Sequence, residues 1–429
     1  MRPPSPISIG LLGLGTVGSE VYRLLADQES ISARAGMPLA VTRVAVAGTA
    51  KLRSVDVPPA LLTADAGAVV ESRDVDIVVE LIGGLEPARG LILRAMHRGK
   101  SVVTANKQVM AAHGTELLAS AQAARVDLCF EGSVGGGIPL IKPIRESLAA
   151  GRISRLIGIL NGTTNYILTR MTRDGSTMEE ALADARQRGF AEADPTEDLD
   201  GHDAAAKLAI LASVAFHTGV SGRDIFREGI RRVTRKEIGY AAELGFAVKL
   251  LAIARRRNGE IEARVHPALL PQQHPLAVVP EEFNAVLVEG EGMGPVVFSG
   301  RGAGGAPTAV AVVGDVIDAA RNLSVDAAGR STPLLTQAAR MRPMEDVALP
   351  YYLSFQLTDR PGVFARVATV FGEEHVSIAS IVQKSRGEVA DAILVTHETP
   401  ERSVRRVLAR LEGMDVVKTV NNVMRVEAT

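Results

Sequence analysis

The stretch ISIGLLGLGTVGSEVYRLL, residues 7–25, predicts the fold of the first part of the chain. Its first six residues are mainly apolar, glycines follow, and apolar residues then recur at helical spacing. A strand, a tight glycine turn and a helix in this order are typical of a dinucleotide-binding turn. Gly13 permits the turn, Gly15 leaves room for a pyrophosphate, and Gly18 lets helix and strand pack closely, with the phosphate at the helix N-terminus. A tight turn without a ligand is the alternative.

Further apolar strands alternate with helical segments up to about residue 130, which predicts a doubly wound parallel sheet of the Rossmann type. The predicted strands are 41–47, 77–81, 101–104 and 126–130, and a helix is predicted at 87–98. The second strand is not followed by the acidic residue that binds a ribose 2′-hydroxyl. Lys51 and Arg53 lie just beyond it and favour NADP, unless both are solvated loop cations.

Composition excludes several classes of protein. The 429 residues are 46% hydrophobic and 23% charged, which is typical of a globular chain of about two or three domains. A net charge of −1, 3% aromatic residues and no Trp argue against nucleic acid and anionic membrane surfaces as partners. We find neither a signal peptide nor an apolar run of ~18 residues. Cys129 is the only cysteine, so we expect a cytoplasmic location.

The middle of the chain predicts an α+β domain. Glycines and a proline interrupt the pattern at 132–139 and predict a hinge. Helices are predicted at 176–188, 203–217 and 238–256, and strands at 156–160, 260–269 and 284–289. A glycine-rich loop and an amphipathic helix at 301–322 are expected to return to the first domain.

The last part reads strand, helix, strand, strand, helix, strand, which is the order of a small ferredoxin-like (βαββαβ) module. Its predicted elements are 351–357, 366–371, 377–383, 392–396, 401–411 and 416–426. The expected organisation is a nucleotide-binding domain (1–133), an α+β domain (134–300), a segment that returns to the first domain (301–325), a linker (326–349) and a ferredoxin-like domain (350–429).

An acidic segment, GFAEADPTEDLDGHDAAAK at 189–207, packs six carboxylates into twelve residues before an Ala-rich helix. Asp203 and Lys207 are four residues apart and share one face of that helix. They form either a surface ion pair or, in a cleft, a carboxylate that positions a proton-donating ammonium. Asp203 also suits a helix cap, and we expect His202 to be solvated.

Three other segments are candidates for binding. Lys107 follows a strand at the carboxyl edge of the sheet and meets either a ligand or solvent. The polar run NGTTN at 161–165 binds a polar substrate or caps the next helix. Glu131 and the glycine turns through Ile138 form either a monovalent-cation site, with one carboxylate and backbone oxygens, or a hinge.

These motifs together resemble the homoserine dehydrogenase family. The resemblance rests on the run at 185–207, NGTTNYIL at 161–168, ELIGG at 80–84, TANK at 104–107 and EGSVGGGIP at 131–139, and covers most of residues 7–320. The last part, with DRPGVF at 359–364, resembles an ACT domain, a regulatory amino-acid-binding module.

The resemblance implies NAD(P)-dependent interconversion of L-homoserine and L-aspartate 4-semialdehyde. It makes Lys207 the proton donor, Asp203 and Glu192 the substrate-contacting acids, and Lys107 a second active-site lysine. The implied cofactor contacts are Gly13, Gly15, Thr16, Val17, Gly18, Lys107, Gly189 and Gly304, and the implied sodium site is Glu131, Val134, Gly136 and Ile138. The chain departs from the family pattern at Ala47-Gly48-Thr49, where an Arg-Asp type pair is usual, so NAD and NADP both stay open.

The resemblance also makes residues 134–300 the catalytic and dimerisation domain and residues 350–429 the regulatory domain. It implies threonine as effector and a homodimer or homotetramer. Two alternatives differ from it: an inactive amino-acid sensor acting through the ACT module, and a reductase of another small aldehyde or hydroxy acid. The Asp203 and Lys207 pair and the two glycine-rich segments favour an active dehydrogenase.

Overall fold

The computed structural model describes residues 6–49, 54–330, 332, 333, 335, 337–384 and 387–427. Lys51 and Arg53 lie outside the described residues. The chain divides into two units. The first is Met1–Ser154, Ala206–Asp224 and Val288–Ala339, and the second is Arg155–Ala205, Ile225–Leu287 and Arg340–Thr429. The domain boundaries predicted from composition stay a prediction.

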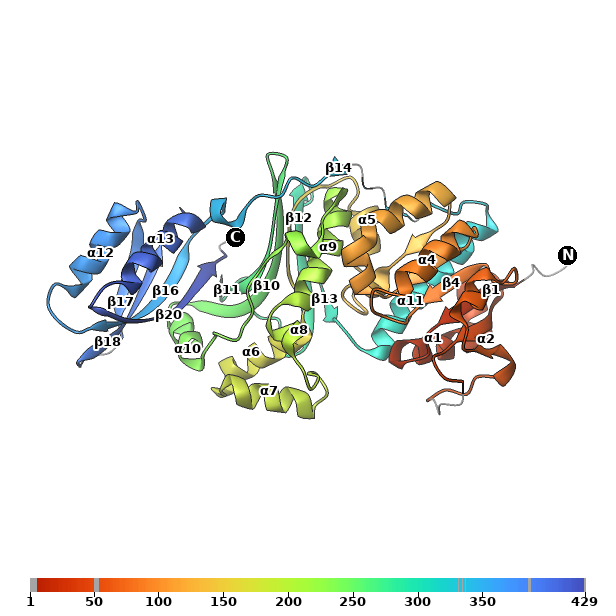
Figure 1. Cartoon of the computed structure of the whole chain (residues 1–429), viewed down its shortest axis with the longest axis horizontal. Helices are drawn as coiled ribbons and strands as arrows, with labels where there is room; N and C mark the ends of the chain where they lie inside the picture. Colours follow the sequence, from red (N-terminus) through yellow and green to blue (C-terminus); the bar gives the residue numbers. More distant parts are fainter. Residues whose placement is uncertain are drawn as a thin grey trace. The chain divides into compact units, whose positions relative to one another are not determined.

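A six-stranded parallel sheet is the centre of the first unit (Figure 1). Its strands are β1 (Ile7–Leu12), β2 (Leu39–Ala45), β3 (Leu62–Thr63), β4 (Ile77–Glu80), β5 (Ser101–Thr104) and β6 (Leu128–Cys129). They lie in the order β3-β2-β1-β4-β5-β6, so the strand before the glycine turn is central. β4 and β5 are buried along their whole length, because both faces of the sheet are covered. The predicted doubly wound sheet is confirmed.

Helices cover this sheet on both faces. They are α1 (Thr16–Ala26), α2 (Gln28–Ala35), α3 (Ala66–Glu71), α4 (Ala88–His97), α5 (Lys107–Ala124) and α11 (Gly305–Ser324). Apolar side chains of α1, α2 and α11 share a core with Ile9 and Leu11 of β1. Gly10, between them, faces the other side, where an added Cβ would lie 2.6 Å from Val69 Cγ1 of α3. The glycine-rich segment that leads into α11 therefore belongs to the same unit as the parallel sheet.

Short elements complete the first unit. They are η1 (Pro59–Leu61), η2 (Glu131–Ser133), the π-helical turn η3 (Pro143–Ser147), β8 (Thr218–Gly219), η4 (Gly222–Asp224), β13 (Val296–Arg301) and β14 (Gln337–Ala338). β14 pairs with β8 in parallel. In the described part of the chain, we find no helix with both the length and the apolar character of a membrane span.

The second unit contains a larger sheet and a group of helices. The strands of its first part are β7 (Arg152–Ile159), β9 (Phe226–Arg227), β10 (Phe246–Arg257), β11 (Glu260–Pro271) and β12 (Phe283–Glu291). The helices of this unit are α6 (Gly162–Asp174), α7 (Met178–Gln187), α8 (Thr196–Leu199) and α10 (Arg235–Glu243). Helix α9 (His202–Phe216) begins in this unit, and its residues from Ala206 onward are counted in the first unit. β10 pairs antiparallel with both β7 and β11, and β9 adds to β11 in parallel. The predicted α+β architecture is confirmed.

One predicted element is wrong. Residues 238–256 were expected to form one helix, but α10 ends at Glu243 and β10 begins at Phe246. Between them Gly245 has φ +83, a conformation that ends a helix and favours glycine. The apolar run from Val248 to Ala254 is continuous because β10 is buried on both faces, and such a run cannot be told from a buried helix by its periodicity.

The C-terminal module has the predicted βαββαβ order. Its elements are β16 (Tyr351–Thr358), α12 (Val363–Glu373), β17 (Ile378–Gln383), β18 (Val389–Thr396), α13 (Glu401–Glu412) and β20 (Val417–Val426). The sheet order is β20-β16-β18-β17, with antiparallel pairing, and α12 and α13 pack on it in one core. The ferredoxin-like prediction is confirmed.

A sheet edge joins the module to the rest of the second unit. β20 pairs with β11 in parallel, with Ala268 opposite Arg425 and Leu269 opposite Val426. The module's sheet therefore continues the sheet of β7, β10, β11 and β12, which we call the central sheet (Figure 1). Before the module, η5 (Met344–Asp346) precedes β15 (Ala348–Leu349), which pairs with β19 (Thr399–Pro400). The last strand of the chain, β20, therefore belongs both to the sheet of the module and to the larger sheet of the second unit.

Candidate active site

The glycine turn between β1 and α1 has the geometry of a phosphate-binding loop. Gly13 has φ +99, and a Cβ there would lie 2.6 Å from the carbonyl oxygen of Leu81. A Cβ on Gly18 would lie 2.3 Å from the carbonyl oxygen of Gly13, so this position tolerates no side chain. Around Gly15, in contrast, no atom lies within 4 Å of an added Cβ. The turn is thus closed toward the protein and open toward a ligand.

A cavity of about 690 Å³ lies beside this turn, at the carboxyl edge of the parallel sheet. Its wall includes Gly13, Gly15, Thr16, Gly48, Leu81 and Ile82. Thr16 and Val17 begin α1, whose N-terminus suits a pyrophosphate. No acidic residue occurs between the end of β2 and Thr49, so a carboxylate for a ribose 2′-hydroxyl is absent from this described stretch. The size and the open backbone of the cavity fit a nicotinamide dinucleotide.

The second glycine-rich segment lies beside the first. Gly304, with φ +124, precedes the first residue of α11. A Cβ on Gly305 would lie 2.9 Å from Thr16 Cγ2, so the start of α11 reaches the start of α1. Gly304 therefore stands next to the cofactor cavity within the first unit.

A buried carboxylate holds the loop that contributes Leu81 and Ile82 to the cavity wall. Glu80 ends β4 and is fully buried; its Oε1 accepts hydrogen bonds from the N–H of Ile82 (2.8 Å) and of Gly83. Its Oε2 accepts one from Thr104 Oγ1 (2.7 Å) at the end of β5. Sequence analysis gave Glu80 no role, although an acid that ends a fully apolar strand signals a function there.

The next strand positions one of the candidate lysines. The Asn106 side chain caps α5 by accepting from the N–H of Val109, and its amide donates to the carbonyl oxygen of Gly84 (2.7 Å). Lys107 is the first residue of α5 and is half-buried. It therefore begins the helix at the carboxyl edge of the sheet, in the unit that holds the cofactor cavity.

The carboxylate of Glu131, a residue of the predicted cation site, organises the turn from Glu131 to Lys142. The Glu131 carboxylate accepts three backbone hydrogen bonds, from the N–H of Leu140, of Ile141 (2.8 Å) and of Lys142 (2.7 Å). Its own N–H donates to Asp315 (2.8 Å), and burial together with the charge of Glu131 raises the pKa of Asp315 well above its usual value. Both oxygens of the Glu131 carboxylate already accept backbone hydrogen bonds, so a cation at this turn would be bound by backbone carbonyl oxygens.

Those oxygens belong to the residues of the predicted sodium site. Val134 and Ile138 are buried, and Gly136 has φ +56. Within the described residues, no three His, Cys, Asp or Glu side chains gather in a way that could hold a metal. The candidate donors at this turn are therefore carbonyl groups, which suit a hard monovalent cation.

The polar run at 161–165 and the acidic segment meet in the second unit. Asn161 caps α6, because its Oδ1 accepts from the N–H of Thr164 (2.8 Å). Its amide nitrogen donates to Asp198 Oδ1 (2.6 Å) and to Asp203 Oδ2 (2.8 Å). Both Asn161 and Asp203 are buried. One side chain thus caps a helix and orients two carboxylates. The cap is one of the two alternatives that the sequence left open, and the other, binding of a polar substrate, stays a prediction.

Asp203 and Lys207 both belong to α9. Asp203 lies in its first turn, and Lys207 follows one turn later on the same face. Lys207 is 8% exposed, so most of the residue is shielded from bulk water. His202, the first residue of the helix, is half-buried. The helix therefore presents a carboxylate and an ammonium group in a protected environment, as a proton-transfer site requires.

Glu192 and Gly189 lie in the loop between α7 and α8. Gly189 has φ +77 just after α7, and Arg186 fixes the loop by donating to the carbonyl oxygens of Glu192 (3.4 Å) and Ala193 (2.9 Å). The Glu192 side chain is exposed, and its carboxylate has no hydrogen bond within the described residues. The loop holds this carboxylate available for a ligand.

Comparisons with known proteins agree with this architecture along the whole chain. The family model described as homoserine dehydrogenase matches residues 139–317, its NAD-binding domain matches 13–131, and the ACT domain matches 351–415. A homoserine dehydrogenase of Corynebacterium glutamicum is 47% identical, over 99% of this chain and 96% of that protein.

Solved structures show the same likeness. The crystal structure of a homoserine dehydrogenase from Thiobacillus denitrificans has a TM-score of 0.92 at 42% identity, with 100% of this chain and 99% of that chain covered. A hyperthermophilic archaeal homoserine dehydrogenase in complex with NADPH has a TM-score of 0.62 at 28% identity, with coverages of 73% and 98%. With its glycine turn, cofactor cavity and buried lysine helix, the chain therefore belongs to the homoserine dehydrogenase family of NAD(P)-dependent oxidoreductases.

Proposed function

We propose that α9 carries the proton transfer of the reaction between L-homoserine and L-aspartate 4-semialdehyde, with Lys207 as the acid or base. The observation that supports this most strongly is the burial of Lys207 one turn after Asp203, which Asn161 holds by a hydrogen bond of 2.8 Å. A positioned, buried ammonium group next to a fixed carboxylate is what a carbonyl oxygen that gains negative charge needs.

The nicotinamide cofactor, when bound, donates or accepts the hydride. Lys207 donates a proton or hydrogen bond to the aldehyde oxygen during reduction and takes the proton back from the alcohol during oxidation. Lys107, at the start of α5, is the second lysine that we assign to the reacting oxygen or the nicotinamide. Because the substrate carries an α-ammonium group, we assign Asp203 and Glu192 to pair with it.

The assigned cofactor contacts are supported in part by the cavity of the first unit, whose wall includes Gly13, Gly15 and Thr16. We assign Gly13, Gly15 and Gly18 to the pyrophosphate turn and the start of α1 (Thr16, Val17) and Gly304 to its surroundings, with Gly189 as a further contact from the loop after α7. The missing carboxylate after β2 favours NADP, with NAD as the alternative. Steady-state assays with both nucleotides decide the preference.

Threonine is the effector that we propose for the C-terminal module. The turn before α12 has Gly362 with φ +88 and offers the backbone N–H groups of a helix start to an amino-acid carboxylate. Hydrogen bonds connect the module to the rest of the second unit, because Glu237 of α10 accepts from Tyr352 Oη (2.6 Å) and Ser354 Oγ (2.9 Å) of β16. We propose that these contacts transmit the effect of the bound effector. Substituting Asp359→Ala should abolish threonine inhibition and leave uninhibited turnover unchanged; inhibition that persists unchanged rejects this role.

Three further properties complete the proposal. We propose a homodimer or homotetramer, a cytoplasmic location, and a sodium ion held by the carbonyl oxygens of Glu131, Val134, Gly136 and Ile138. The ion would brace the turn between the parallel sheet and η3, since monovalent ions polarise carbonyl groups weakly.

An absorbance assay of the reduced nicotinamide with homoserine tests the whole proposal. Hydride transfer to either nucleotide supports it. No transfer at any pH would favour the sensor alternative, and failure of homoserine together with turnover of an unrelated alcohol would favour another reductase.

A further inference from the structure

A cavity of about 330 Å³ in the second unit is lined mainly by arginines and glutamates. Its charged wall includes Arg155, Arg255, Arg257, Arg342, Glu262 and Glu427. We call it the arginine cavity. Arg155 comes from β7 and two of the other arginines from β10, whereas Glu427 follows the last strand of the C-terminal module. The cavity therefore lies where the central sheet meets the module.

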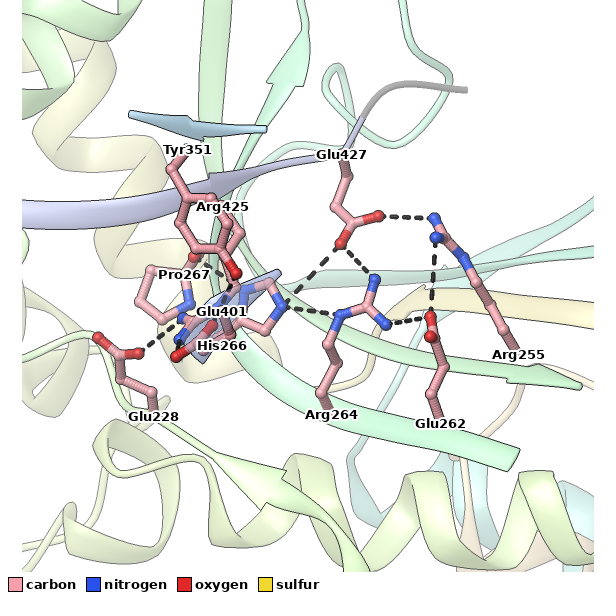
Figure 2. A network of polar contacts seen from close by, with 10 residues as sticks. All are labelled: Glu228, Arg255, Glu262, Arg264, His266, Pro267, Tyr351, Glu401, Arg425 and Glu427. Carbon is pink, nitrogen blue, oxygen red and sulfur yellow. Dashed lines mark hydrogen bonds and ion pairs between the residues drawn. The ribbon is translucent and has the colours of Figure 1, made fainter. Parts of the chain in front are cut away.

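Two acids of this wall, Glu262 and Glu427, are already engaged by arginines (Figure 2). Glu427 is fully buried and accepts hydrogen bonds from Arg255 Nη2 (2.8 Å) and from Arg264 Nη2 (2.6 Å). Glu262 pairs with Arg264 and lies 3.7 Å from Arg255 Nη1. Arg264 itself is 1% exposed. Two arginines thus share two carboxylates, and this part of the network is close to neutral.

The remaining arginines give the cavity an excess of positive charge. Arg257 is exposed and has no ion pair within the described residues, and the side chain of Arg342 donates only to the carbonyl oxygen of Asp346 (2.8 Å) in that part of the chain. The third acid of the wall, Glu398, is exposed at its rim. The wall holds four guanidinium groups and three carboxylates. Arg264, which is buried and pairs with Glu262 and Glu427 of the wall, adds a fifth guanidinium group, so the cluster as a whole carries an excess of two positive charges.

The positive charges affect one another. Burial lowers the pKa of Arg255, and the neighbouring guanidinium groups of Arg264 and Arg155 lower it further, against the attraction of Glu427. Like charges that are held together in a partly desolvated cavity are stabilised when an anion enters.

We propose that the arginine cavity binds a compact dianion, either a dicarboxylate or a phosphate. The excess of two positive charges matches a dianion, and a guanidinium group binds both kinds of oxyanion through paired N–H groups. The volume is at the small end of the range for ligand pockets, so it suits a compact ligand. Arg257 belongs to the central sheet and Arg342 to the segment that leads into the module, so a dianion held by both links the two parts.

This proposal does not depend on the catalytic one, and binding alone tests it. Calorimetric titrations use the full chain, with inorganic phosphate and with malonate as probes, at constant ionic strength set with chloride. The nicotinamide nucleotide is present in excess, so that its own phosphate site is filled. Arg257→Gln and Arg342→Gln remove one charge each without breaking an ion pair of the described residues, and should each weaken binding ~10-fold or more.

Arg152→Gln is the matched control. Arg152 lies on the same strand as Arg155, is 87% exposed, and is not part of the cavity wall. We expect the Arg152→Gln variant to bind either probe with the same affinity as the unmodified chain. Binding of phosphate alone, of malonate alone, or of both supports the proposal and identifies the source of the dianion. The proposal would be overturned if neither probe gave a heat of binding, or if both the Arg257 and the Arg342 variant bound the probes as tightly as the unmodified chain. The cluster would then serve only to hold the central sheet and the module together.

Discussion

Asn161→Asp is the substitution that tests the arrangement around α9 most sharply. The carboxylate keeps the cap of α6, because Asp accepts the N–H of Thr164 as well as Asn does. It removes both N–H donors, however, and places a third carboxylate 2.6 Å from Asp198 and 2.8 Å from Asp203.

The loss can be estimated from these two contacts. A hydrogen bond to a charged group contributes about 1.5–3 kcal/mol, so the loss of both costs about 3–6 kcal/mol before repulsion is counted. Because Asn161 and Asp203 are buried, hydrogen bonds to water do not fully replace the two lost hydrogen bonds. If Asp203 moves by as little as ~1 Å, we expect kcat/KM for homoserine to fall ~10²-fold.

Two measurements check this prediction. Hydrogen exchange at the starts of α6 and α9 reports the local loss of stability, and steady-state kinetics report the catalytic loss, with nucleotide affinity unchanged. Thr177→Ala is the control, since it removes the cap of α7 at a cost of about 1 kcal/mol and should leave the kinetics unchanged. Normal exchange and normal kinetics in Asn161→Asp would refute the role of Asn161.

Two other predictions concern the cofactor turn and a buried lysine. Gly18→Ala places a Cβ 2.3 Å from the carbonyl oxygen of Gly13, so nucleotide affinity in a fluorescence titration should fall ~10-fold or more, whereas Gly314→Ala, which meets no atom within 4 Å, should not change it. Equal affinities in both variants would contradict the close packing of α1. Lys249 donates to Asn165 Oδ1 (2.8 Å) and to the carbonyl oxygen of Val279 (2.7 Å), and burial lowers its pKa to about 8. Since the unfolded chain keeps this proton up to about pH 10.4, the lysine makes stability rise with pH between about 8 and 10. Lys249→Met should remove that rise in unfolding experiments across this range, and an unchanged pH dependence would show that Lys249 does not titrate there.

Much of the fold could be predicted because local patterns decide it. The glycine turn, the alternation of strands and helices, and the βαββαβ order all depend on residues close in sequence. The segment 238–256 could not be assigned correctly, because β10 is stabilised by pairing with β7 and β11 rather than by its own periodicity.

The candidate site was predictable in its parts but not in its connections. The motifs at 161–165 and 189–207 both stood out, yet the bond from Asn161 to Asp203 joins residues 42 positions apart and has no local signature. The same holds for Glu427, which reaches Arg264 across 163 positions. Glu80 was inside a recognised motif, but its hydrogen bonds to the following loop appear only in the structure.

The role of Lys207 is the central claim, and the turnover of Lys207→Ala tests it most directly. The removal of a positioned acid or base lowers turnover ~10²- to 10⁴-fold, so we expect a loss of this size in homoserine oxidation with an unchanged dissociation constant for the nucleotide. Turnover within about twofold of the unmodified chain would contradict the account.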